Sequence, residues 1–280
     1  MSRKSLLSET TALFLLISCL GCEIPPGEQV VPPDEKNFSD FMSEGQAAER
    51  EGKYDEALVA YEAAAARYSL SPLAFHAVGR MRHRLRDLDG AIEAYKGAIR
   101  LVPDDVTYQS TIYIDLGEAC LAKNDLEQAS SAFRVAIEKR PNDAAARTGL
   151  AAAYLGLGRS RLAREQLDQA LTDSPNYAKG QHWMGRVEEF DRELRRAEAR
   201  YRKAIGLNPN DPSLYIPLVR LLERQGRLDE ASALAIRAEY LDKDKTYELP
   251  LPPGPGRSDP RIPPKGLKPP PALEERPIRQ

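Results

Sequence analysis

Small and bulky apolar residues recur along the chain at a long, nearly fixed period. Six pairs of alanines, with seven residues from one member to the other, begin at spacings of 34, 38, 34, 34 and 34 residues. The first alanines of the pairs are Ala57, Ala91, Ala129, Ala163, Ala197 and Ala231. In five pairs a bulky residue stands between the alanines: Tyr61, Tyr95, Phe133, Leu167 and Tyr201. Self-similarity at this period predicts an array of copied helical units.

Two further positions recur with the alanines. A small residue precedes the first alanine by twelve residues in five copies, and these residues are Gly45, Gly79, Gly117, Ala151 and Gly185, with Val219 in the sixth. A proline follows it by twelve residues in four copies: Pro103, Pro141, Pro175 and Pro209. This pattern resembles the tetratricopeptide repeat, a 34-residue pair of antiparallel helices. The resemblance covers residues 38–245 and implies an all-α, right-handed α-solenoid of six helix pairs, at 38–71, 72–105, 110–143, 144–177, 178–211 and 212–245.

The residue types predict how the two helices of a pair pack. Helices approach closely only where side chains are small, so we expect the glycine of the first helix to face an alanine of the second. We expect the intervening bulky residue to fill the space between one repeat and the next.

The turns follow from glycine and proline. Gly52, Gly158 and Gly226 should end the first helix of their repeats in the left-handed conformation, and Asn124 should do so in the third repeat. The extra residues around 105–109 should lengthen a surface connection. Pro217 should kink the first helix of repeat six or delay its start.

The N-terminal region resembles a bacterial lipoprotein signal. Residues 1–18 carry two basic residues near their start, Arg3 and Lys4, and continue into an apolar stretch too short to span a membrane. Cys19 is the preferred lipid-bearing residue because residues 16–19 fit the lipobox at each position. Cys22, the alternative, follows the favoured glycine but has an unusual cysteine three residues before it. An ordinary cleaved secretion signal is the other interpretation. Residues 19–37 should form the lipidated cysteine and a flexible linker.

The C-terminal residues 246–280 hold half of the prolines in the chain and should be disordered, as a spacer or as a proline-rich ligand. The last helix precedes them with an unusually apolar surface, made of Ala231, Leu234, Ala235, Ala238 and Leu241. We expect Tyr247, Leu249 and Leu251, or a second chain, to cover it.

Composition excludes several kinds of chemistry. The formal net charge of −2 over 280 residues argues against bulk nucleic-acid binding. His76 and His83 share a helix face but have no cysteine nearby, so neither a metal site nor a cofactor is expected. Cys120 should be a buried core residue. Gly156 and Gly158 belong to a helix turn rather than a phosphate loop. With no catalytic constellation in sight, the chain is predicted not to be an enzyme.

The repeat phase assigns residues to a binding surface. In tetratricopeptide arrays the first helices line a concave groove, exposing positions 2, 5, 9, 12 and 13 of each repeat. The predicted partner-binding residues are His76, Arg80, His83, Arg84, Thr148, Ala152, Lys179, His182, Arg186, Arg220 and Arg224. Acidic members, Glu49, Glu118, Glu189 and Glu223, should moderate the basic field through local ion pairs. Trp183, beside this surface, is either an aromatic anchor or a wall contact.

These features predict a membrane-anchored interaction scaffold of the bacterial cell envelope that binds acidic or carboxylate-bearing segments of unidentified envelope proteins. A solvated charged face without a ligand is the alternative. The two-carboxylate clamp of chaperone-binding relatives is not matched. The chain is also similar to type IV pilus pilotins, which assist a secretin, and an adaptor for cell-wall enzymes is a further alternative. Neither cysteine is followed by aspartate, which favours the outer membrane, facing the periplasm.

Overall fold

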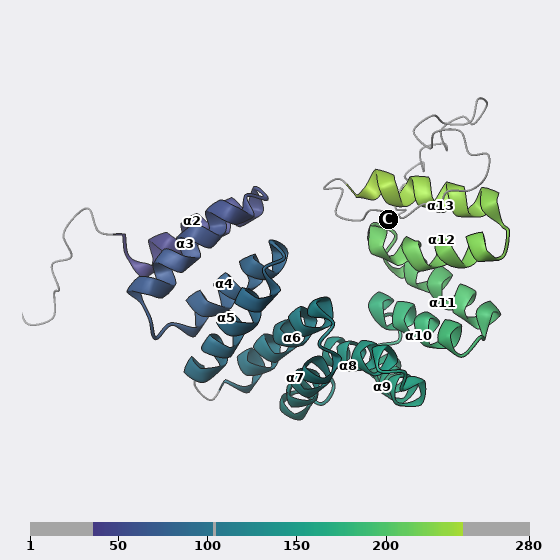
Figure 1. Ribbon diagram of the computed structural model, residues 1–280, viewed down its shortest axis with the longest axis horizontal. Coiled ribbons are helices and arrows are strands. Elements are labelled where there is room, and N and C mark those ends of the chain that lie inside the picture. The colour runs from purple at the N-terminus through teal and green to yellow at the C-terminus, as the bar shows by residue number, and fades with distance from the viewer. Residues whose placement is uncertain (1–35, 103–104, 243–280) are drawn as a thin grey trace, which may run out of the picture. The chain divides into compact units, whose positions relative to one another are not determined.

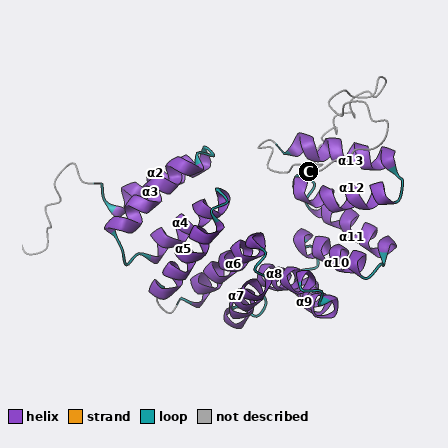
Figure 2. Cartoon of the chain, in the orientation of Figure 1, coloured by secondary structure: helices purple, strands orange, loops and turns teal. Residues whose placement is uncertain are grey.

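The computed structural model describes residues 36–102 and 105–242 of the chain. This part contains twelve α-helices and one 3-10 turn, with no strand (Figures 1 and 2). The helices are α2 (Phe38–Arg50), α3 (Tyr54–Arg67), α4 (Pro72–Arg84), α5 (Leu88–Leu101), α6 (Val106–Lys123), α7 (Leu126–Lys139), α8 (Ala144–Gly156), α9 (Ser160–Asp173), α10 (Ala178–Phe190), α11 (Leu194–Leu207), α12 (Tyr215–Arg224) and α13 (Leu228–Leu241), and the 3-10 turn η1 covers Pro212–Leu214. The prediction of an all-α fold is confirmed.

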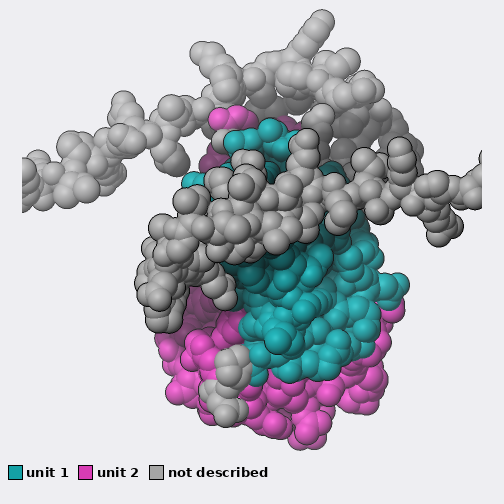
Figure 3. Space-filling model, turned by 90° about the vertical axis from the view of Figure 1, so that its left-hand side faces the viewer, with its two compact units in different colours: residues 1–103 teal, residues 104–280 magenta. Residues whose placement is uncertain are grey.

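The chain forms two compact units, Met1–Pro103 and Asp104–Gln280 (Figure 3). The described helices of unit 1 are α2–α5, and those of unit 2 are α6–α13. In both units the helices pack in consecutive pairs joined by tight turns. We call the first helix of each pair the A helix and the second the B helix.

Polar residues placed just before the helices fix where they begin. Asn37 and Asp40 form a capping box at the start of α2, each accepting a hydrogen bond from the other's backbone N–H. Asp87 caps α5 by accepting from the Gly90 N–H, and Asp125 caps α7 by accepting from the Gln128 N–H. These contacts satisfy backbone donors that the first helical turn leaves unpaired.

A residue with positive φ follows each of six A helices. Gly52, Gly158 and Gly226 have φ angles of 76°, 73° and 76°, and Asn124 has a φ of 66°, all as predicted. Repeats two and five use Arg86 and Arg192 instead, each with a φ of 67°. No sequence signal marks these two, because arginine has no preference for the left-handed region.

The extra residues of the third repeat lengthen a helix rather than a connection. Asp105 accepts a hydrogen bond from the Tyr108 N–H, so α6 begins at Val106 and runs for 18 residues. The prediction of a longer surface connection is therefore wrong. Four added residues make about one helical turn, which continues α6 without a break in its backbone pairing.

In the four repeats that have it, the periodic glycine of the A helix lies against the bulky residue of its own B helix. A Cβ built on Gly117 would lie 2.7 Å from Cζ of Phe133, and one built on Gly185 would lie 2.7 Å from Cε1 of Tyr201. Gly45 meets Tyr61 in the same way, and Gly79 meets Tyr95. The prediction that glycine faces alanine is wrong, because the aromatic ring occupies the space that a side chain would need.

The repeats without a glycine compensate in size. Ala151 and Leu167 share one core cluster in repeat four, and in repeat six Ala235 packs against the cluster that contains Val219. A larger residue on the A helix is thus matched by a smaller one on the B helix. The ring of Phe133 also reaches Gly149 of the next repeat, so the predicted filling between repeats holds there.

Pro217 delays the last A helix, as predicted. The 3-10 turn η1 precedes α12, which begins only at Tyr215 and has 10 residues. In α13, Ala231 and Ala238 are buried and Leu234, Ala235 and Leu241 are half-buried, and the residues expected to cover this surface lie outside the described residues. The exposed apolar side chains there belong to Leu228, Ile236 and Tyr240.

The predicted lipoprotein signal, the linker up to residue 35 and the proline-rich tail lie outside the described residues, as do Cys19, Cys22, Tyr247, Leu249 and Leu251. Of the helices within 36–102 and 105–242, none combines the length and the apolar character needed to cross a membrane.

Candidate functional site

The A helices of repeats three to five stack directly on one another. Helix α8 contacts both α6 and α10, so the A helices of repeats three to five form one continuous row. Positions 2, 5, 9, 12 and 13 of repeats three to six, counted from residues 110, 144, 178 and 212, make up what we call the A-helix face, which lies on α6, α8, α10, η1 and α12. It carries the predicted partner-binding residues of unit 2.

In unit 1, the predicted residues differ in exposure. His76 is buried, with its ring centroid 5.8 Å from that of Tyr95, so the expectation that it is exposed is wrong. His83 is half-buried, and Arg84 is exposed with its guanidinium 5.2 Å from the ring centroid of Tyr54. Hence only part of this set is available to a partner.

Arg80 is held by an acid of the preceding repeat. Its Nη2 donates to Oε2 of Glu49 at 3.0 Å, and the Tyr61 hydroxyl donates to the same oxygen at 3.2 Å. Burial raises the pKa of Tyr61 to about 12, with a further contribution from the Glu49 charge. The carboxylate thus joins the A helix, the B helix and the next A helix.

The same arrangement recurs in unit 2. Tyr201 donates to Oε2 of Glu189 at 2.6 Å, and Arg224 donates to Oε1 of that carboxylate. Burial and the hydrogen bond to Glu189 both raise the pKa of Tyr201. Arg224, like Arg80, therefore already has an anionic partner, as the predicted local ion pairs require.

Sequence reasoning did not assign these tyrosines to the polar network. The pattern that could have revealed these contacts is a spacing of twelve residues from glutamate to tyrosine, which both Glu49–Tyr61 and Glu189–Tyr201 show. The repeat pattern marks the tyrosines only as bulky apolar residues.

The middle of the A-helix face is made of small residues on α8. Thr148 and Ala152 are only 3% and 4% exposed, and Ala145 is half-buried. Their predicted exposure is therefore wrong for the first two. The Thr148 hydroxyl is buried and has no hydrogen-bond partner among the described residues.

His182 on α10 occupies the position that corresponds to Thr148. Its ring centroid lies 5.7 Å from that of Trp183 and 5.9 Å from that of Tyr201, with both rings edge-on to it. Burial, followed by the nearby charge of Arg186, lowers the pKa of His182 to about 4, so the imidazole is neutral at pH 7. Its Nδ1 is buried, and no described residue offers it a hydrogen bond.

Three predicted cations of unit 2 have no ion pair within the described residues. Lys179, Arg186 and Arg220 are exposed, and no carboxylate of the part of the chain that the structure describes lies within ion-pair distance of them. The Arg186 guanidinium lies 5.1 Å from the ring centroid of Trp183, which is half-buried, and Glu118 acts on Lys179 from farther away. These cations remain available to an anionic group.

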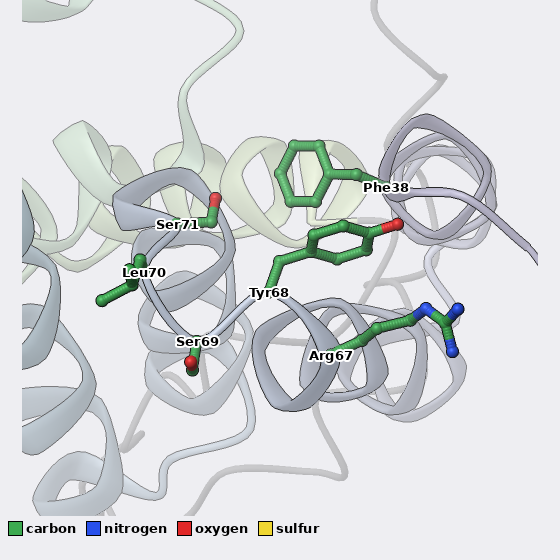
Figure 4. Close-up of a pocket in the computed structure, with 6 residues that line it drawn as sticks. All are labelled: Phe38, Arg67, Tyr68, Ser69, Leu70 and Ser71. Carbon is green, nitrogen blue, oxygen red and sulfur yellow. The ribbon is translucent and has the colours of Figure 1, made fainter. Parts of the chain in front are cut away.

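A pocket lies elsewhere, in unit 1. It has a volume of about 550 Å³ and is lined by Phe38 and by residues 67–71, where α3 ends and the connection to α4 begins (Figure 4). The rings of Phe38 and Tyr68 meet edge to face, with centroids 5.2 Å apart. Sequence reasoning did not identify this pocket, because its residues come from a helix start and a connection rather than from a repeated position.

Metal binding and the environment of Cys120 were the remaining candidates for chemistry in the described part of the chain. Within 36–102 and 105–242, no three His, Cys, Asp or Glu side chains are grouped so that they could hold a metal ion. Cys120 is fully buried, as predicted, and its Sγ lies 3.5 Å from Oε1 of Gln128.

Comparison with known proteins agrees with this geometry. Two family models, both described as tetratricopeptide repeat, match residues 42–106, and residues 121–184 and 191–247. The chain belongs to the tetratricopeptide repeat family. Proteins of this family are protein–protein interaction scaffolds, and in general the fold is not catalytic.

Curated relatives share only part of their length with this tetratricopeptide repeat chain. Cellulose synthase operon protein C of Pseudomonas fluorescens (strain SBW25) is 28% identical over 166 residues, 58% of this chain and 13% of that protein. The Hsp70-Hsp90 organising protein of Plasmodium falciparum is 27% identical over 137 residues, 48% of this chain and 54% of that protein. The chain therefore spans about half or less of these relatives.

A solved structure supports the fold alone. The chain is similar to a thermophilic tetratricopeptide repeat protein of Thermus thermophilus, with a TM-score of 0.56 and 24% identity, over 66% of this chain and 99% of that one.

Proposed function

We propose that this protein is a lipid-anchored interaction scaffold of the bacterial cell envelope, and that it holds acidic or carboxylate-bearing segments of partner proteins on the A-helix face of unit 2. This proposal rests on the exposure and the ion pairing of the cations on that face. Arg224 is bound by Glu189, whereas Lys179, Arg186 and Arg220 are exposed and have no ion pair in the described residues. Arginine and lysine that no internal acid satisfies are suited to an external carboxylate.

Charge reversal tests the binding surface. Lys179→Glu, Arg186→Glu and Arg220→Glu, combined in the full chain, should abolish co-purification of envelope partners crosslinked in cells. The matched control reverses Arg134, Arg195 and Lys203, which are exposed on the B helices α7 and α11 and give the same change in net charge. Helical circular dichroism should be unchanged in both variants. Equal partner recovery from the first variant and from wild type would reject the proposed surface.

The anchor rests on the sequence of residues 1–22 and is tested separately. We propose that Cys19 carries the lipid and that the protein resides in the outer membrane, facing the periplasm, where the cell has two membranes. Labelling with a fatty acid should fail in Cys19→Ser and persist in Cys22→Ser. The reverse result would move the lipid to Cys22, and a wild-type chain that takes up no label would be an unanchored protein.

A further inference from the structure

The last B helix carries an apolar patch at positions that are polar or small in the other repeats. The fifth residue after the first alanine of the pair is Ile236 in α13, whereas the other five repeats have Glu62, Lys96, Arg134, Asp168 and Arg202 there. The ninth residue is Tyr240, whereas the others have Ala66, Arg100, Glu138, Thr172 and Gly206. Ile236 and Tyr240 are 53% and 74% exposed, and they share one side of α13 with the exposed Ala233. We call Ala233, Ile236 and Tyr240 the α13 patch.

The α13 patch is not the surface on which a further repeat would stack. Stacking uses the eighth residue after the first alanine. A Cβ built on Gly180 of α10 would lie 3.0 Å from Cδ2 of Leu171, and Ile205 packs against the core cluster of repeat six. In α13 the eighth residue is Glu239, which is exposed. The stacking side of α13 is therefore polar at this position, and the apolar patch lies on another side of the helix.

The α13 patch is too small to hold a second copy of the chain by itself. A stable interface between two proteins takes about 800 Å² from each partner, and three side chains, one of them a single methyl group, supply only a fraction of that area. A segment of the same chain does not need such an area, because a short connection keeps it at an effective concentration in the millimolar range. The size of the patch therefore favours an occupant from within the chain.

The sequence that follows α13 suits this patch. The described residues end at Asp242, directly after α13 and two residues after Tyr240 (Figure 1). Apolar residues then recur at every second position as Tyr247, Leu249 and Leu251. In an extended chain, alternate side chains lie on one side, so these three can contact a surface together.

The lengths of the segment and the patch also agree. In an extended chain, residues 247–251 span about 13 Å. The patch runs from Ala233 to Tyr240, which is about 10 Å along the helix. The four residues 243–246 are enough for a reverse turn, which would lead the chain back along α13.

We propose that residues 247–251 fold back on α13 in an extended conformation, with Tyr247, Leu249 and Leu251 against the α13 patch. The contact removes from water apolar surface of both the helix and the segment. Because the patch belongs to a B helix, the A-helix face stays open to a partner. The inference is independent of the proposed function.

Proteolysis of the full chain tests the contact. Chymotrypsin cleaves after Tyr247 and after Leu273, and only the first site lies in the docked segment. Ile236→Asp combined with Tyr240→Thr gives α13 the residues that repeat four has at these positions, Asp168 and Thr172. Cleavage after Tyr247 should become about tenfold faster in this variant, because the cleavage rate follows the population of the released segment. Cleavage after Leu273 should not change.

A second variant leaves α13 intact. Leu249→Ser with Leu251→Ser should also speed cleavage after Tyr247, and adding it to the patch variant should give no further increase, because both remove the same contact. Val59→Asp, which changes an exposed apolar side chain of α3, is the control and should cleave like wild type. Helical circular dichroism should be the same in all variants.

Four results would overturn the inference. Cleavage after Tyr247 that is as fast in wild type as in the patch variant would show that the segment does not dock. Additive effects of the two variants would show that the segment and the patch do not touch each other. Protection that grows with protein concentration, together with a dimer in sedimentation, would assign the patch to a second copy. Loss of a crosslinked partner from the patch variant, with unchanged cleavage after Tyr247, would assign it to that partner.

The proposed function is tested apart from this contact. Reversal of Lys179, Arg186 and Arg220 should leave cleavage after Tyr247 unchanged, since these residues lie on A helices and not on α13. Loss of partners in that reversal would therefore say nothing against docking of residues 247–251, and failure of docking would leave the A-helix face as proposed.

Discussion

The hydroxyl of Tyr201 donates to Oε2 of Glu189 at 2.6 Å, which joins α11 to the last turn of α10. Tyr61 and Glu49 form the corresponding contact between α3 and α2 at 3.2 Å. In both places an arginine of the following A helix binds the same carboxylate. Arg224 binds Glu189, and Arg80 binds Glu49. A single acid thus ties together one repeat and the A helix of the next.

Tyr201→Phe should lower the free energy of unfolding by about 1–2 kcal/mol, because it removes a hydrogen bond to a charged group and leaves the ring in place. Urea unfolding measures the change. Tyr240→Phe, at a side chain that is 74% exposed, is the control and should have no effect. If the two variants had equal stability, the Tyr201 contact would contribute nothing.

The periodic alanines predicted the helix pairs, because small side chains that recur at a fixed period mark a close helix contact that is repeated in each unit. They did not predict what the glycines face. Glycine and alanine are both small, and size alone does not separate them, although the ring of Phe133 needs the complete absence of a side chain at Gly117. The pairing of sizes becomes visible only when the A and B helices are compared sixteen residues apart, as at Gly117 and Phe133.

The sequence predicted which helices carry the candidate residues, but not their ion pairing or their protonation. Repeat phase placed Arg80, Arg224 and His182 on A helices correctly. It could not show that two of them are already bound by glutamates or that the third is neutral, because ion pairing and burial depend on side chains of neighbouring helices. The left-handed conformation of Arg86 could not be predicted either, because the surrounding turn and not the residue type imposes it.

Gly117→Ala tests the matching of sizes. The added methyl group would overlap the Phe133 ring, so the free energy of unfolding should fall by about 1–3 kcal/mol. Phe133→Leu alone should also destabilise, by leaving a cavity. The double variant reproduces the pair Ala151 and Leu167 of repeat four, and its loss should be smaller than the two single losses added together. Additive losses in urea unfolding would contradict size matching.

His182 should make the fold sensitive to acid. Its native pKa is about 4 and its ordinary value is 6.5, so the unfolded chain takes up the proton first as the pH falls. Stability should therefore fall as the pH decreases from 6.5, by about 3 kcal/mol at pH 4. His182→Phe should lack this component. Parallel stability curves for wild type and variant between pH 6.5 and 4 would contradict a depressed pKa.

Glu188 should have the opposite dependence on pH. It is 2% exposed, and burial raises its pKa above the ordinary value of 4.5, although Arg200 donates from Nε to its Oε1 at 3.3 Å and opposes the shift. The native protein therefore holds this proton more tightly than the unfolded chain does. The resulting stabilisation is complete below pH 4.5 and is lost as the pH rises through the native pKa.

This second dependence is best measured in the His182→Phe background, where the acid sensitivity of the imidazole is absent. Adding Glu188→Gln should remove a fall in stability above pH 4.5, measured by urea unfolding in steps up to about pH 8. Glu230→Gln is the control, because Arg227 lowers the pKa of that exposed acid and confines its effect to lower pH, with the opposite sign. A fall above pH 4.5 that persists after Glu188→Gln would mean that another buried group titrates there.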